Sequence, residues 1–172
     1  MKWYIALEIG TLALVVQSGM YAADPQALLS QADQDKLHET FAEMTRSVRL
    51  LFFTQTVGCE TCVMTREILD ELPALSDRIA IEEINLVLEP ERARPYGIDR
   101  APGIAIVWQD ESAQPHDSRI RFLGAPSGYE FISLVQAVLL AGGRPSGLSD
   151  QNRARLAAVD KPMTMQVFTT PT

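Results

Sequence analysis

The chain has 172 residues, of which 47% are apolar and 22% charged, and its formal net charge is −7 at pH 7. This length allows one domain with a sizeable core but not two complete domains of average size, and the composition is that of a globular protein. The acidic balance, without clusters of lysine and arginine, argues against binding to the phosphate backbone of nucleic acids. We therefore expect no nucleic-acid partner.

Residues 1–26 are predicted to form an N-terminal extension. The apolar run 3–16 resembles a signal peptide, but Glu8 interrupts it and no good small-residue cleavage site follows. The run is also too short for a transmembrane helix, so no membrane partner is expected. We expect Met20 to be the true start, which would make residues 1–19 a non-native extension and place the protein in the cytoplasm. A working signal would instead favour the periplasm or secretion.

The first predicted elements are a helix over residues 30–46 and a strand over 48–54. Leu37, Phe41 and Met44 recur at the spacing of one helix face. The strand is apolar at nearly every position, which is typical of a strand that is covered on both faces of a sheet.

The only two cysteines, Cys59 and Cys62, are spaced Cys-x-x-Cys between this strand and a helix predicted over residues 59–71. A thiol on the first turn of a helix is exposed to the partial positive charge of the N–H groups, which favours the thiolate. A second thiol one turn later can attack a mixed disulfide formed by the first. The motif beside a βα pattern therefore predicts a dithiol–disulfide redox centre.

A zinc site and a pair of inert thiols are weaker interpretations of these two cysteines. Zinc would need two more ligands, and His38 and His116 lie at separations that match none of the usual zinc-finger spacings. Two buried, inert thiols would be unusual at a helix start directly after Gly58. We expect no metal and no cofactor other than the disulfide itself.

The second half of the chain continues the alternation of strands and helices. Apolar positions predict a strand over residues 78–88, and Pro90 suits the first position of a short helix that ends near Tyr96. Strands over 104–108 and 119–123, joined by a polar loop, predict an antiparallel hairpin.

The last predicted helix follows Ser127, which forms a capping box with Glu130. Phe131, Leu134, Val135, Val138 and Leu139 line one face, and a pair of glycines ends the helix. The order β-α-β-α-β-β-α predicts an α/β fold with a mixed four-stranded sheet flanked by helices, plus an extra N-terminal helix.

This order, the Cys-x-x-Cys placement and the run Arg100-Ala101-Pro102-Gly103 resemble the thioredoxin superfamily. The resemblance implies that Pro102 is cis and faces the disulfide, and that the backbone of Ala101 pairs with an extended substrate. It also implies that Cys59 is the nucleophile and Cys62 the resolving thiol. By the same resemblance, the remaining substrate-contacting residues are Gly58, Glu60 and Thr61.

A narrower resemblance is to the glutaredoxin-like protein disulfide oxidoreductases, which carry two thioredoxin units in tandem. It rests on Leu29-Ser30, on the strand 50–55 and on the run 124–131. An internal repeat supports it, because Leu148-Ser149 followed by Leu156 repeats the spacing of Leu29-Ser30 followed by Leu37, and residues 165–169 resemble the first strand. The sequence thus predicts a domain over 27–144 and, over 145–172, a linker and the incomplete start of a second unit. Residues after Ser146 should be poorly anchored or docked on the sheet edge.

Several side chains qualify the expected mechanism. Glu60 places a negative charge near Cys59, which opposes thiolate formation and favours a reductase or isomerase over a strong oxidant. Phe53 stands where many thioredoxins have a buried acid, which leaves Glu82 or Glu83 as the candidates for proton transfer, although both are also expected as surface charges. Trp108 is expected in the core, and both histidines are expected in solvent.

The predicted function is reduction or isomerisation of protein disulfides, with a reductase or a small thiol as electron donor. A redox-inactive, peptide-binding thioredoxin-like module is the alternative. A metal or iron–sulfur site shared across a dimer is a third, weaker possibility.

Overall fold

A computed structural model describes residues 28–169. The predictions for residues 1–26 and for the last three residues therefore lie outside the described part of the chain. In order, the elements are α1 (Gln31–Phe41), β1 (Val48–Thr54), α2 (Cys62–Asp70), β2 (Ile79–Asn85), α3 (Pro90–Ala93), the 3-10 helix η1 (Arg94–Tyr96), β3 (Gly103–Gln109), β4 (Pro115–Leu123), α4 (Tyr129–Ala141) and α5 (Asp150–Ala157).

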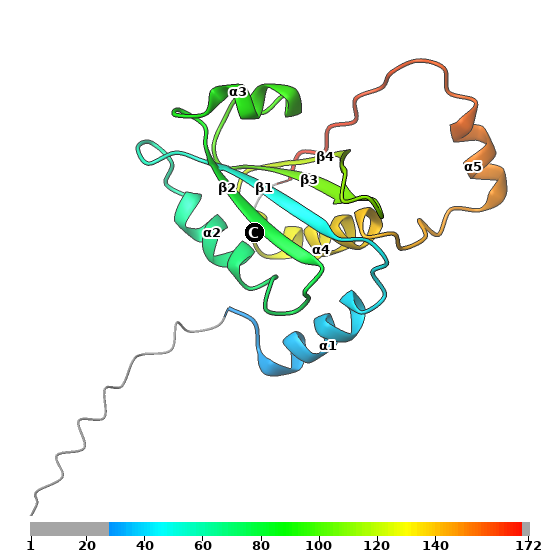
Figure 1. Cartoon of the computed structure of the whole chain (residues 1–172), viewed down its shortest axis with the longest axis horizontal. Helices are drawn as coiled ribbons and strands as arrows, with labels where there is room; N and C mark the ends of the chain where they lie inside the picture. Colours follow the sequence, from blue (N-terminus) through cyan, green and yellow to red (C-terminus); the bar gives the residue numbers. More distant parts are fainter. Residues whose placement is uncertain (1–27, 170–172) are drawn as a thin grey trace, which may run out of the picture.

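The four strands form one mixed sheet in the order β2-β1-β3-β4 (Figure 1). β1 pairs in parallel with β2, with Val48 opposite Ile79, and antiparallel with β3. β3 and β4 form the predicted antiparallel hairpin. The predicted fold class is confirmed, and α2 provides the crossover that a parallel β1–β2 pair requires.

Successive residues of β1 point to opposite faces of the sheet, and both faces are buried. Leu50 and Phe52 belong to the larger core cluster, which includes residues of α2 and α4. Leu51 and Phe53 belong to the smaller cluster, which includes Ala93 of α3. The two layers of helices therefore cover both faces, as the continuous apolar run predicts.

Several element boundaries differ from the prediction. β4 begins at Pro115, inside the predicted polar loop and before the predicted start at 119, and β2 ends at Asn85 instead of at residue 88. β1 spans the predicted residues 48–54, whereas α1 ends at Phe41 and is followed by a turn in which the Met44 amide donates to the Phe41 carbonyl at 3.0 Å. The short helix after Pro90 is split into α3 and η1, and Gly97 ends it in the left-handed conformation (φ 65°). That conformation is one that glycine adopts without steric cost.

The predicted capping box of α4 is wrong. The N-cap is Gly128, at φ 56°, and it makes no side-chain capping bond. Because the helix begins one residue later than the capping box requires, Glu130 lies at the second helical position and not the third. The helix itself is confirmed, and it ends at the predicted pair of glycines.

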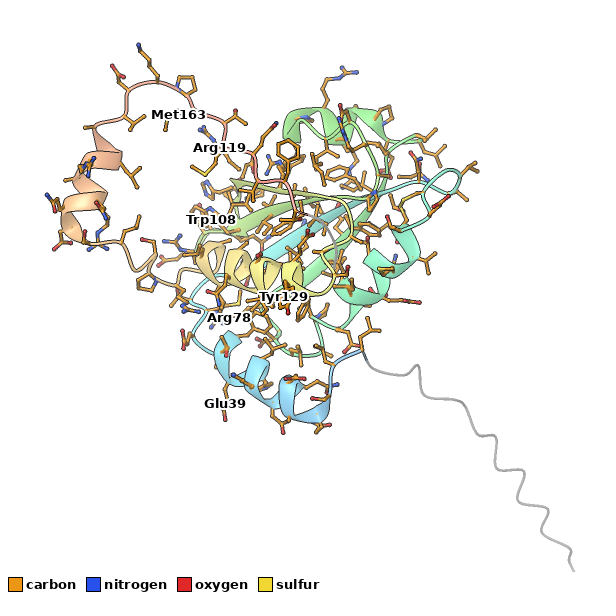
Figure 2. The ribbon with its side chains drawn as sticks, turned by 180° about the vertical axis from the view of Figure 1, so that it is seen from behind. Glu39, Arg78, Trp108, Arg119, Tyr129 and Met163 are labelled. Carbon is orange, nitrogen blue, oxygen red and sulfur yellow. A yellow bond between two sulfur atoms is a disulfide. The ribbon has the colours of Figure 1, made fainter. Side chains whose placement is uncertain are left out.

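The segment after residue 144 is an exposed arm. Ser149 caps α5 by accepting from the Asn152 amide at 3.3 Å, just as Ser30 caps α1 by accepting from the Asp33 amide at 3.2 Å. Every residue of 145–169 is exposed, and 158–169 form no strand. Figures 1 and 2 show α5 apart from the sheet, with Met163 on the arm beyond it. Of the two predicted arrangements, the structure shows the unanchored one.

We expect Leu134→Ala to lower the free energy of unfolding by about 2–5 kcal/mol, because truncating a fully buried leucine removes apolar contacts and leaves a cavity. Leu156 on α5 is 55% exposed, so Leu156→Ala should change stability by less than about 0.5 kcal/mol. Urea unfolding followed by circular dichroism measures both. An equal loss for the two variants would contradict the assignment of α5 to an exposed arm.

We also expect the Asp117 carboxylate to stabilise β4 in a pH-dependent way. Burial raises its pKa, but the hydrogen bonds from Arg121 at 2.8 and 2.6 Å outweigh burial, and the net pKa is lowered. Its contribution is therefore complete above the unfolded pKa of about 3.9 and is lost as the pH falls through the lower folded pKa.

Asp117→Asn should consequently be less stable than the wild type at neutral pH, and the difference should vanish in acid. Urea unfolding across this range measures it, with Asp77→Asn as a control on an exposed aspartate. A difference that persists unchanged in acid would show that the effect is not due to the charge.

Candidate functional site

The cysteine pair lies in the turn that leads from β1 into α2. Gly58 adopts φ 76°, a conformation that favours glycine, and the Gln55 side-chain amide donates to the Val57 carbonyl at 3.0 Å. The Cys62 amide donates to the Cys59 carbonyl at 3.4 Å. This turn brings the two cysteines together directly beyond the buried end of β1.

Cys59 and Cys62 form a disulfide, with their Cα atoms 5.4 Å apart. Cys59 is partly exposed, whereas Cys62 is only 6% exposed and belongs to the larger core cluster. One sulfur is thus accessible and the other is shielded. Such an asymmetric pair suits exchange with an external disulfide through the accessible sulfur.

The predicted start of the helix at Cys59 is wrong. α2 begins at Cys62, with Thr61 as an N-cap that makes no side-chain bond. Cys59 precedes the helix because of the positive φ of Gly58 and the turn after it. The first helical hydrogen bond is the one that the Thr65 amide donates to the Thr61 carbonyl at 2.9 Å. Only Cys62 occupies the first helical turn.

The loop before β3 lies at the same end of the sheet as the cysteine turn, because Gly103 pairs with Phe53 near the end of β1. The Ala101–Pro102 peptide bond is cis, as the resemblance implied. Pro102 is buried, and its carbonyl accepts from the Gly124 amide at 2.9 Å. Ala101 and Cys59 both pack against the core cluster that contains Cys62. Within the described part of the chain, no hydrogen bond uses the backbone N–H or C=O of Ala101, so both groups are available to a bound peptide.

The residues next to the cysteines in the sequence include one charged side chain, Glu60. Gly58, Glu60 and Thr61 are all exposed. Two valines that the sequence interpretation did not consider are exposed beside them, Val57 at 83% and Val63 at 67%. Apolar residues within two positions of a reactive cysteine are a signal that could have found these contacts, because exposed apolar side chains gather at binding surfaces.

The candidates for proton transfer are engaged elsewhere. Phe53 belongs to the smaller core cluster, on the opposite face of the sheet from Cys62. Glu82 forms ion pairs with Arg49 and Arg92, and Glu83 pairs with Arg66. The interpretation of both glutamates as surface charges fits these ion pairs.

The two histidines differ from each other. His38 is exposed, as predicted. His116 is only partly solvated: its side chain is 44% exposed, its ring stacks on Trp108 with the centroids 4.3 Å apart, and its Nε2 lies 2.8 Å from an Asp110 carboxylate oxygen. Trp108 is half-buried, at the edge of the core.

Clustered metal ligands are absent from residues 28–169, since nowhere in this range do three or more His, Cys, Asp or Glu side chains gather as a metal site requires. In the same range, each helix is too short or too polar to cross a bilayer.

Comparison with known proteins finds similarity to thioredoxins. No model of a known protein family matches the sequence. The chain is 32% identical over 78 residues to a probable thioredoxin of Methanothermobacter thermautotrophicus, and this match covers 45% of the chain and 80% of that protein.

Two solved structures share the fold over a longer region. The NTD_N/C domain of the alkylhydroperoxide reductase AhpF from Enterococcus faecalis is 28% identical with a TM-score of 0.69, and the match covers 77% of this chain and 62% of that one. For a protein disulfide oxidoreductase from Aeropyrum pernix the identity is 23%, the TM-score 0.63, and the coverage 75% and 54%. The chain therefore spans less than two thirds of each of these structures.

The sequence match covers most of a probable thioredoxin, and the fold places a bonded Cys-x-x-Cys pair after β1 and a cis proline directly before β3, at the same end of the sheet. In proteins with this arrangement, the cysteine pair undergoes thiol–disulfide exchange with protein disulfides, and a partner returns it to the dithiol. The chain belongs to the thioredoxin family and is a thiol–disulfide oxidoreductase.

Proposed function

We propose that the protein reduces or isomerises protein disulfides, with Cys59 as the nucleophile and Cys62 as the resolving thiol. The observation that carries this assignment is the unequal exposure of the two bonded sulfurs, since Cys59 is partly exposed and Cys62 is 6% exposed. A protein disulfide can reach only the exposed sulfur without disturbing the core.

The proposed reaction starts from the dithiol. The Cys59 thiolate attacks one sulfur of the substrate disulfide, a mixed disulfide forms, and the other substrate sulfur leaves as a thiolate that takes a proton from solvent. Cys62 then loses its proton and attacks Cys59 Sγ, which releases the second substrate thiolate and forms the Cys59–Cys62 disulfide. Two electrons pass to the substrate, and a reductase or a small thiol returns two electrons to the pair.

We propose that an extended substrate segment pairs with the backbone of Ala101. The free N–H and C=O groups of this residue, next to the buried Pro102, support this role. Gly58, Glu60 and Thr61 are exposed next to the cysteines in the sequence and would contact the same segment. No buried carboxylate serves the reaction in this proposal, so the Cys62 proton passes to solvent.

The reductive direction fits a compartment that keeps thiols reduced, and we place the protein in the cytoplasm on that basis. The Glu60 charge beside Cys59 supports this direction, because it disfavours the thiolate that stabilises the reduced form of strong oxidants.

We further propose that the domain over residues 27–144 is followed by a linker and the start of a second thioredoxin-like unit over 145–172. The capping of α5 by Ser149, which repeats the capping of α1 by Ser30, supports this division. The exposed side chains of Met165, Val167 and Phe168 support it further, because they match the apolar positions of a buried first strand.

Insulin reduction by dithiothreitol tests the cysteine roles. We expect Cys59→Ser to lower the rate to that of dithiothreitol alone, because no accessible thiolate remains. Cys62→Ser should also lose turnover but should still form a stable mixed disulfide with a disulfide probe, visible by mass spectrometry. A Cys59→Ser variant that keeps the wild-type rate would refute the assignment. A stable mixed disulfide on Cys62 in that same variant would refute it too.

The charge of Glu60 gives a second test. Glu60→Gln should raise the rate at which iodoacetamide alkylates Cys59 at neutral pH by roughly threefold, because a screened charge on the adjacent residue contributes on the order of 1 kcal/mol or less against the thiolate. The reduction potential should rise in parallel, because the thiolate form of the reduced state becomes more stable. Glu67→Gln, at an exposed position farther along α2, is the matched control. An equal change in both variants would rule out a specific effect of Glu60.

A further inference from the structure

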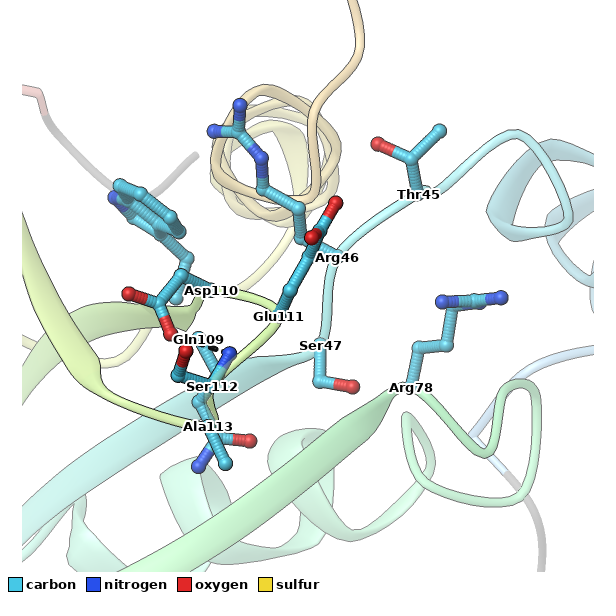
Figure 3. A pocket seen from close by; sticks show the side chains of 10 residues that line it. Thr45, Arg46, Ser47, Arg78, Gln109, Asp110, Glu111, Ser112 and Ala113 are labelled. Atoms are coloured by element: carbon cyan, nitrogen blue, oxygen red, sulfur yellow. Dashed lines mark hydrogen bonds between the residues drawn. The ribbon is translucent and has the colours of Figure 1, made fainter.

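A cavity of about 820 Å³ lies at the opposite end of β1 from the disulfide. It opens where β1 and β2 begin and where β3 ends (Figure 3). The residues that carry the argument are Arg46, Ser47, Arg78, Trp108, Asp110 and Glu111, and we call the site the Arg46–Arg78 cavity.

Two arginines approach this cavity from different segments. Arg46 precedes β1 and Arg78 precedes β2, and the Val48 amide binds the Arg78 carbonyl at 2.8 Å, which fixes the two segments side by side. Neither guanidinium forms an ion pair with any residue of 28–169. Other arginines of the same range do so, namely Arg49, Arg66, Arg92, Arg100, Arg121, Arg144 and Arg153.

Arg46 is held in place by an aromatic ring. Its Cζ lies 4.5 Å from the centroid of the Trp108 ring, while His116 stacks 4.3 Å from the same centroid. Both groups approach the ring this closely, so they occupy opposite faces of it. Stacking orients the guanidinium and leaves its N–H groups free to donate in their own plane.

The acidic residues of the cavity wall form no ion pair with Arg46 or Arg78 within residues 28–169. The Asp110 carboxylate accepts from the Ser112 and Gln114 amides, each at 2.9 Å, and lies 2.8 Å from His116 Nε2. The bond to His116, followed by that to Gln114, lowers the pKa of Asp110 and keeps it committed to its own turn. Glu111, on the same turn, is the remaining carboxylate of the wall and points toward the Arg46 side in Figure 3.

We propose that the Arg46–Arg78 cavity binds a small oxyanion that carries two or more negative charges, on phosphate or carboxylate groups. Guanidinium groups donate pairs of N–H bonds that fit the oxygens of both groups. The Ser47 hydroxyl adds a neutral hydrogen-bonding group to the same wall. The site is separate from the cysteine pair, so binding does not depend on the redox reaction.

Isothermal titration of the oxidised full-length protein with pyrophosphate and with citrate tests the proposal. We expect saturable binding of at least one of them, weakened about tenfold or more in Arg46→Ala and in Arg78→Ala by the loss of charged hydrogen bonds. Glu111→Gln should bind more tightly, because a like charge is removed from the wall. Trp108 fluorescence in a Trp3→Phe background provides an independent signal from inside the cavity.

Arg155→Ala, on exposed α5 and without an ion pair in residues 28–169, is the matched control and should bind as the wild type does. Binding of pyrophosphate alone would assign the site to phosphates, and binding of citrate alone to carboxylates. The proposal fails if neither anion binds saturably. It also fails if the double variant of Arg46 and Arg78 binds as well as the wild type, or if Arg155→Ala weakens binding equally. None of these outcomes depends on oxidoreductase activity.

Discussion

The pairing of β1 with strands on both sides is the constraint on which the rest of the structure depends. β1 is hydrogen-bonded to β2 in parallel and to β3 antiparallel, and its residues are buried on both faces. A parallel pair needs a crossover, so the chain must leave the carboxyl end of β1 through a helix before it returns as β2. That exit is the turn that holds Cys59 and Cys62. The place of the redox pair is therefore a consequence of strand pairing, and the reactive turn is supported by the most buried strand of the molecule.

The bounds of an element could be predicted where its residues are buried without interruption. They could not be predicted where the backbone conformation of one turn residue sets the start of a helix. β1 has the predicted bounds because all of its positions except Arg49 are buried. The starts of α2 and α4 were wrong by a few residues because Gly58 and Gly128 both adopt positive φ, which shifts the first helical residue. Glycine is compatible with many conformations, so its identity does not reveal which one the surrounding structure selects.

The candidate site shows the same division. Spacing alone identifies Cys59 and Cys62, and the resemblance to a family identifies the cis Pro102. The exposed Val57 and Val63 could have been found from their places next to the cysteines in the sequence. The stack of Arg46, Trp108 and His116 could not be predicted, because its members come from different elements. Polarity suggested a solvated His116, but a half-buried tryptophan on the neighbouring strand offers a histidine a flat partner and Asp110 offers it a hydrogen bond. The contacts of His116 thus come from the tertiary structure, whereas its local sequence indicated only a polar loop.

The comparison of α1 with α5 separates local signals from tertiary ones. Both helices start at a serine whose hydroxyl accepts an amide hydrogen bond three residues later. α1 is anchored because Phe41 at its end is fully buried, whereas α5 has no buried residue. A cap contributes only about 1 kcal/mol, and short helices in water owe most of their stability to a packed face. A helix without such a face, followed by Phe168 at 90% exposure, therefore has the features of an element whose packing partner lies outside residues 28–144. This argument from burial supports the proposed second unit independently of the repeated spacing.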